Sequence, residues 1–196
     1  IYIKKLFIFK IEKKEMKKLI FVFVLISFSF LTKAQSLSLE EKKLYSLIME
    51  YRASIGLSKI PLSKSLTTVA QAHCYDLVTN KPDLGNCNAH SWSANGKWSS
   101  CCYTPDHKQS NCMWNKPKEL TNYSDIGFEI ACGSNVCCSD YVMTADYAFK
   151  SWLKSSGHHD VLANKNSWSS YDWKAIGIGI EGGFATVWFG AAEDVN

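Results

Sequence analysis

The sequence lacks the short motifs of several large enzyme classes. It has no Gly-x-Ser-x-Gly motif, which argues against the nucleophile turn of an α/β-hydrolase. It has neither a phosphate-binding loop nor the strand–turn–helix fingerprint of a dinucleotide-binding fold. Cys-x-x-Cys spacing is also absent, so a zinc site made of thiolates is not favoured. No internal repeat is visible, and a solenoid is therefore not expected.

The chain also lacks an apolar run that is comfortably long enough to span a membrane. The run at 19–31 follows Lys17 and Lys18, and the small-residue stretch 32–34 comes directly after it. A basic start, an apolar middle and a small-residue end are typical of a secretory signal peptide, with cleavage predicted before Gln35. The protein is therefore expected to be secreted.

Two interpretations of the N-terminus remain open. Met16 directly precedes the lysines, so residues 1–15 are interpreted as sequence upstream of the true start. An uncleaved signal anchor is the less favoured alternative, because residues 1–11 are also apolar. On the favoured interpretation, residues 1–34 are removed, residues 35–196 form one domain, and the mature protein is not an integral membrane protein.

Positive charge is scarce once the export segment is removed. The whole chain has a formal net charge of +4, but the eight Lys and two Glu of residues 1–34 carry +6, which leaves residues 35–196 at −2. Nucleic acid is therefore not an expected partner. A domain of this length can bury a substantial hydrophobic core.

Cysteine, by contrast, is plentiful. The eight cysteines all follow the export segment: Cys74, Cys87, Cys101, Cys102, Cys112, Cys132, Cys137 and Cys138. An even number of cysteines after an export signal predicts four disulfides, although the sequence does not determine their pairing. Because a bridge between neighbouring residues strains the backbone, each member of the two adjacent pairs is expected to reach a distant partner.

Hydrophobic periodicity and turn signals predict a small α+β domain. Helices are expected to begin after Ser38, after Ser63 and at Ala145, and to end at Gly56, at 80–82 and at Gly157. A strand is expected at 127–133 and a hairpin at 175–181 and 184–189. Residues 81–126 show no periodicity, and a loop of this length is usually functional or stapled.

Six short motifs occur along this chain in a fixed order: 51–57, 70–73, 90–92, 152–158, 175–179 and 185–188. The series resembles the CAP superfamily of cysteine-rich secretory proteins, antigen 5 and pathogenesis-related proteins, in the form of its bacterial SCP-like extracellular domains. The resemblance runs from about Leu39 to Gly190. It implies a disulfide-stabilised three-layer α-β-α sandwich around a small antiparallel sheet, with a long inserted loop at about 91–126.

The resemblance also implies a cavity that contains His90, His158 and Glu129. Two neutral imidazoles and one carboxylate suit a divalent cation such as Zn²⁺, with one position left open. The alternatives are a loop histidine that binds backbone at His90, and a positive side chain near a helix C-terminus at His158. Ser155 stands where many relatives carry a second acid, which weakens both a metal site and acid–base chemistry.

Glu129 has two interpretations. The family strand usually reads Gly-Glu-Asn-Ile-Ala, so an alignment without gaps puts Phe128 in the Glu place and Glu129 in the Asn place. Either a β-bulge returns Glu129 to the cavity, which is the favoured interpretation, or the protein lacks this ligand. His73 is interpreted as a core histidine and His159 as a solvated one.

The predicted function is extracellular binding of a ligand in the cleft of His90 and His158, with or without a cation. The resemblance implies a lipid or sterol, a glycan or another protein as the ligand. A metal-assisted hydrolase, with Glu129 as ligand or base, is one alternative. A toxin-like or structural factor that acts through its inserted loop is another. The missing second acid favours binding over catalysis.

Overall fold

The structure is a computed structural model that describes residues 36–136 and 140–195. The predicted signal peptide, with Met16 and the cleavage site before Gln35, lies outside the described residues, as do Cys137 and Cys138. Within the described ranges, no helix combines the length and the apolar character that crossing a membrane requires. The described residues from Leu37 onward belong to one structural unit.

Two helices begin at the serines expected from the sequence. Helix α2 (Leu39–Ser54) starts with a complete capping box, in which the Ser38 hydroxyl accepts from the Glu41 N–H and the Glu41 carboxylate accepts from the Ser38 N–H. Helix α3 (Lys64–Asn80) starts where the Ser63 hydroxyl accepts from the Leu66 N–H at 2.9 Å. It ends at Lys81 in the left-handed region, with φ of 52°.

Three strands form an antiparallel sheet with the order β1-β3-β2. They are β1 (Phe128–Cys132), β2 (Ala175–Glu181) and β3 (Phe184–Gly190). The β2–β3 hairpin turns at Gly182 and Gly183, as the sequence predicts. Strand β1 is therefore an edge strand.

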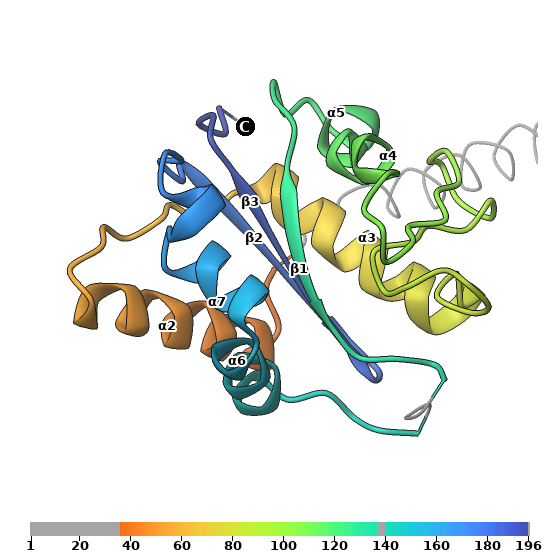
Figure 1. Cartoon of the computed structure of the whole chain (residues 1–196), viewed down its shortest axis with the longest axis horizontal. Helices are drawn as coiled ribbons and strands as arrows, with labels where there is room; N and C mark the ends of the chain where they lie inside the picture. Colours follow the sequence, from red (N-terminus) through yellow and green to blue (C-terminus); the bar gives the residue numbers. More distant parts are fainter. Residues whose placement is uncertain (1–35, 137–139, 196) are drawn as a thin grey trace, which may run out of the picture. The chain divides into compact units, whose positions relative to one another are not determined.

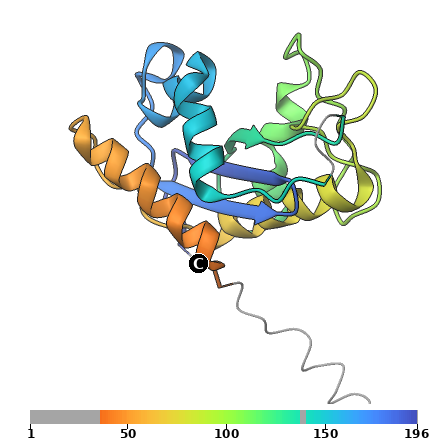
Figure 2. The same ribbon diagram turned by 90° about the horizontal axis from the view of Figure 1, so that it is seen from below.

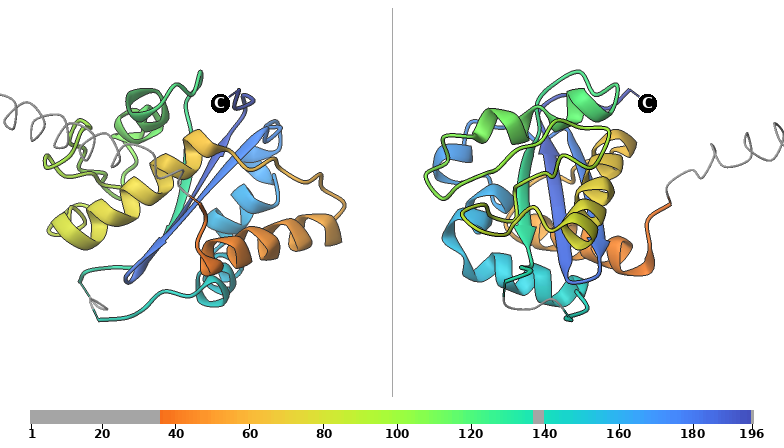
Figure 3. Two further views of the ribbon diagram at one scale, coloured as in Figure 1. Left: turned by 180° about the vertical axis from the view of Figure 1, so that it is seen from behind. Right: turned by 90° about the vertical axis from the view of Figure 1, so that its right-hand side faces the viewer.

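Helices cover both faces of this sheet (Figure 1). Helix α3 and the inserted loop lie on one side, and α2, α6 (Ala145–Lys154) and α7 (Ser156–Leu162) lie on the other. The views in Figures 2 and 3 show the same division. A short 3₁₀ turn, η1 (Asn166–Trp168), follows α7. The predicted three-layer α-β-α sandwich is confirmed.

The break after α6 differs from the expectation. The helix ends at Ser155, which has an extended backbone, and Gly157 lies inside the following helix α7. Glycine costs a helix only about 1 kcal/mol relative to alanine, so it does not have to end one. His158 consequently lies within α7 and not at a helix C-terminus.

The inserted loop contains more regular structure than its composition suggests. Two short helices, α4 (Ser110–Trp114) and α5 (Lys116–Leu120), interrupt the stretch that was expected to be irregular. Helix α5 is held by Lys116, whose fully buried ammonium group donates to the Ser99 carbonyl at 2.5 Å and to the Glu119 carboxylate at 2.6 Å. Both helices are too short to show hydrophobic periodicity in the sequence. Contacts such as those of Lys116 stabilise them instead.

Two disulfides close the inserted loop. Cys87 is bonded to Cys102 and Cys101 to Cys112, so each member of the first adjacent pair reaches elsewhere, as predicted. The expectation of four bridges that use all eight cysteines is wrong for Cys74 and Cys132, which are free thiols in the structure.

The sheet explains why these two thiols do not pair with each other. Cys74 lies on α3 and contacts the Thr186 hydroxyl, on one side of the sheet. Cys132 ends β1 and packs with the core on the other side, where Ser151 of α6 is its neighbour. A disulfide between them would have to pass through the sheet.

Removing the Cys87–Cys102 bridge should lower the free energy of unfolding. Closing a loop of 15 residues contributes about 3 kcal/mol, so the double change Cys87→Ser/Cys102→Ser should cost roughly that amount in urea unfolding. The control Cys132→Ser should cost much less. Alkylation of the unreduced, unfolded protein should modify Cys74 but not Cys102; a modified Cys102 would contradict this pairing.

Gly177→Ala should destabilise the fold. A Cβ at Gly177 would overlap the backbone of Leu66 and Thr67 where α3 crosses β2, and overpacking of this kind costs about 1–3 kcal/mol. Gly157→Ala is the matched control, because a Cβ there meets nothing within 4 Å. Urea denaturation should show the first variant weakened and the second unchanged or stabilised. Equal stability of the two would contradict the close approach of α3.

Candidate functional site

Strand β1 places Glu129 on the face of the sheet that α3 covers. Its pairing with β3 is unbroken, with Phe128 opposite Phe189, Glu129 opposite Trp188 and Ile130 opposite Val187. The favoured hypothesis of a β-bulge is therefore wrong. Phe128 points into the aromatic core on the other side, among Trp114, Trp168, Tyr171 and Trp173.

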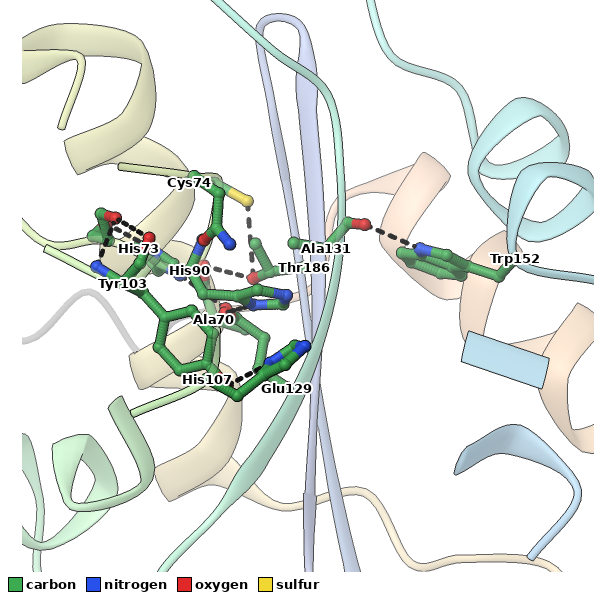
Figure 4. Close-up of polar contacts among 12 residues, drawn as sticks. Ala70, His73, Cys74, His90, Tyr103, His107, Glu129, Ala131, Trp152 and Thr186 are labelled. Carbon is green, nitrogen blue, oxygen red and sulfur yellow. Dashed lines mark hydrogen bonds and ion pairs between the residues drawn. The ribbon is translucent and has the colours of Figure 1, made fainter. Parts of the chain in front are cut away.

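Glu129 nevertheless meets His90, because the first predicted cavity histidine also lies on the α3 side. The Nδ1 of His90 is 2.8 Å from Oε2 of Glu129. In Figure 4 both residues lie on one side of β1, together with His73, Tyr103 and His107. Trp152 lies on the other side, and its indole N–H donates to the carbonyl of Ala131 at 3.1 Å. The alignment without gaps thus gives the correct strand register. The loss of Glu129 from the site, which that alignment implied, does not occur, because Glu129 and His90 lie on the same side of the sheet.

A third residue, His73, completes this cluster. Its Nδ1 is 2.5 Å from Oε1 of Glu129, and its Nε2 is 2.9 Å from the carbonyl oxygen of Ser91. The ring also stacks on Trp92, with centroids 4.2 Å apart and planes 7° from parallel. His73 is a fully buried core histidine, as predicted, but its bond to Glu129 was not predicted. Its place on the inner face of α3 was the only signal that the sequence offered.

The two imidazoles keep the carboxyl group of Glu129 ionised. Its side chain is completely buried, and burial alone would raise its pKa. The electrostatic interactions with His73 and His90 and the hydrogen bonds from both rings outweigh burial, so that the pKa of Glu129 lies below its ordinary value. Both oxygens therefore accept hydrogen bonds from imidazole N–H groups.

His90 is held at several points but keeps one free nitrogen. Its backbone N–H donates to the Asn88 side chain at 3.0 Å, and its ring packs edge-on against Tyr103. About a fifth of its side chain is exposed. With Nδ1 bound to Glu129, its Nε2 has no hydrogen-bond partner within the described residues.

His158 approaches the same region from α7. Its Nδ1 is 2.8 Å from the hydroxyl of Ser155, and its Nε2 also has no partner in the described part of the chain. Burial lowers its pKa and the nearby His90 acts in the same direction, so that the pKa is about 4. His158 is therefore a neutral imidazole at neutral pH. His159 is not simply solvated, because its Nε2 lies 2.5 Å from the hydroxyl of Tyr51.

The predicted metal trio is not assembled as three ligands of one ion. Across residues 36–136 and 140–195, no three His, Cys, Asp or Glu side chains are grouped so that they could hold a metal ion. Glu129 uses both oxygens on imidazoles, so it orients His90, and Ser155 does the same for His158. The residues that fit a cation are then the Nε2 atoms of His90 and His158, and zinc binding stays a prediction.

Comparison with solved structures finds two similar folds. An extracellular protein containing an SCP domain from Bacillus anthracis is 18% identical, with a TM-score of 0.51 over 76% of this chain and 39% of that one. An outer surface protein from Borrelia burgdorferi is also 18% identical, with a TM-score of 0.52 over 79% of this chain and 93% of that one. This is an SCP-type fold. The chain thus spans well under half of the Bacillus protein.

Sequence comparison adds nothing to this SCP-type likeness, since no protein-family model and no curated protein matches the chain. At this level of identity the likeness establishes the fold alone, so the chemistry of the site rests on its own residues.

His158 should make the fold sensitive to moderate acid. Its pKa of about 4 lies below its ordinary 6.5, so the unfolded chain binds a proton in this window that the folded protein does not. Stability should therefore fall as pH drops from 6.5 to 4, and His158→Gln should remove this component. The depressed pKa of Glu129 adds its own loss only below 4.5. Urea unfolding at several pH values tests this, and an NMR titration midpoint of His158 near 6.5 would contradict it.

Proposed function

We propose that this SCP-type protein is exported and binds an extracellular ligand between His90 and His158. The observation that supports this proposal is a pair of partly buried imidazoles from separate elements, each with one nitrogen held and the other without a partner among the described residues. An Nε2 atom that carries no proton offers its lone pair to a divalent cation or to a donor group of a ligand. A lipid or sterol, a glycan or another protein is the proposed ligand class.

Export is supported by two independent features. The two bridges in the inserted loop suit an oxidising compartment, where disulfides form and persist. The similar folds belong to an extracellular protein and an outer surface protein. Together with the predicted signal peptide, these features favour secretion.

A divalent cation fits the two imidazoles, although as a weak site. Neutral Nε2 atoms are suitable zinc ligands, and the groups behind them, Glu129 and Ser155, would fix the orientation of the rings. Structural zinc sites have four protein ligands and catalytic sites three, so two imidazoles alone leave at least one place for a ligand atom or water. When bound, the cation would supply Lewis acidity at this position.

A metal-assisted hydrolase is the second candidate. The Glu129–His90 pair favours it, because a carboxylate that fixes the tautomer of an imidazole orients the ring and raises the basicity of its other nitrogen as a metal ligand. Ser155 in place of a second acid still weighs against it. A toxin-like or structural role for the inserted loop gains no further support from the described residues.

Zinc titration of the wild type and four variants tests the imidazole pair. In calorimetry at neutral pH, His90→Ala and His158→Ala should each abolish most zinc binding, because each removes one of two ligands. The double variant should bind hardly more weakly than either single variant. His159→Gln, which changes the adjacent histidine that contacts Tyr51, should bind like the wild type. Unaltered affinity in both single variants would reject the shared cation site.

A further inference from the structure

We infer that His73 is a positioning residue for the site: it holds Glu129 and the Ser91 carbonyl together so that His90 keeps its Nδ1–H tautomer and a free Nε2. This inference rests on the proposed role of His90. It goes beyond that proposal, because it assigns a function to a histidine that is fully buried from solvent.

The protonation of His73 at Nε2 follows from its partner. A backbone carbonyl can only accept, so the nitrogen 2.9 Å from the Ser91 oxygen must carry a hydrogen. The other nitrogen, Nδ1, lies 2.5 Å from Oε1 of Glu129, so these two atoms share a hydrogen. His73 therefore bridges the carboxyl group on one side and the backbone on the other.

The ring of His73 is also fixed in orientation. It lies flat on Trp92 at 4.2 Å and meets Trp188 edge-on at 6.5 Å, and all three side chains are buried. A flip of the ring would place carbon atoms against the carboxylate and the carbonyl. Such a flip would leave two buried acceptors without partners, each costing about 1–3 kcal/mol or more.

These contacts fix His90 from two directions. Through Glu129, His73 leaves only Oε2 for the Nδ1–H of His90, which dictates the tautomer. Through Ser91, the next residue along the chain, it also fixes the backbone beside His90. The Ser91 hydroxyl in turn accepts from the N–H of Tyr103, whose ring packs against His90.

Three proteins separate this role from a merely structural one. His73→Phe keeps an aromatic ring on Trp92 but removes both hydrogen bonds, so Oε1 of Glu129 loses its partner and the carboxyl group reorients. We expect the single Nδ1–H signature of His90 to be lost. In Glu129→Gln the amide can donate to Nδ1 of a neutral His73 and accept from His90, so the Nδ1–H tautomer should persist.

Long-range ¹⁵N–¹H NMR of the imidazoles, on protein without added ligand, reads these states directly. Wild type and Glu129→Gln should show His90 protonated at Nδ1, and His73→Phe should not. A wild-type His90 protonated at Nε2 would overturn the inference even if His73→Phe fails to fold. An unchanged His90 signature in folded His73→Phe would also overturn it and leave His73 as a core residue.

Zinc titration then separates this inference from the proposed function. Loss of a residue that orients a metal ligand typically weakens affinity 10–100-fold, so His73→Phe should lose about tenfold or more. If wild-type protein binds no zinc but His90 shows the expected tautomers, the proposed cation site fails while the positioning role stands. If zinc binds and the tautomer is insensitive to His73, the opposite holds.

Discussion

The structure depends on the burial of one carboxylate. An ionised side chain without solvent is costly unless hydrogen bonds and opposite charge compensate it. Glu129 has hydrogen-bond contacts with both His73 and His90, which reach it from α3 and from the loop that follows that helix. Three segments distant in sequence are thereby joined at one point on the edge strand β1.

The same requirement accounts for the way in which the inserted loop is held. A long free loop could not keep His90 at hydrogen-bond distance from Glu129, because ordering it costs conformational entropy. Two disulfides reduce that cost, and Asp76 of α3 accepts hydrogen bonds from the backbone and hydroxyl of Ser93. Trp92 fixes the segment between them by stacking on His73. The inserted loop thus both forms part of the site and covers it.

The sequence predicted the features that local signals encode. The serine caps of α2 and α3 and the β2–β3 hairpin follow from nearby residues and are confirmed. The layer order, which the family resemblance implied, is also confirmed. The end of α6 at Ser155 was missed because Gly157 is only a weak helix breaker, and α4 and α5 were missed because they are too short to be periodic.

The site itself was only partly predictable. The face on which Glu129 lies depends on the strand register. The family pattern, displaced by one residue, led to the correct expectation that Glu129 lies near His90, but through a β-bulge that the strand does not contain. The bond between His73 and Glu129 joins residues 56 positions apart, for which a single sequence carries no local signal. The free thiols Cys74 and Cys132 could be separated only once the sheet between them was known.

The adjacent residues Cys101 and Cys102 have a consequence for folding. One bond reaches back to Cys87 and the other forward to Cys112, so a single peptide unit joins two closed rings. Exchanging the two partners would change each ring by only one residue, and chain entropy hardly distinguishes such isomers. What distinguishes them is burial: Cys101 is paired with Trp92 by two backbone hydrogen bonds and is 4% exposed, whereas Cys102 faces outward. The packing of the loop against α3, which buries Cys101, thus favours the observed isomer over the exchanged one.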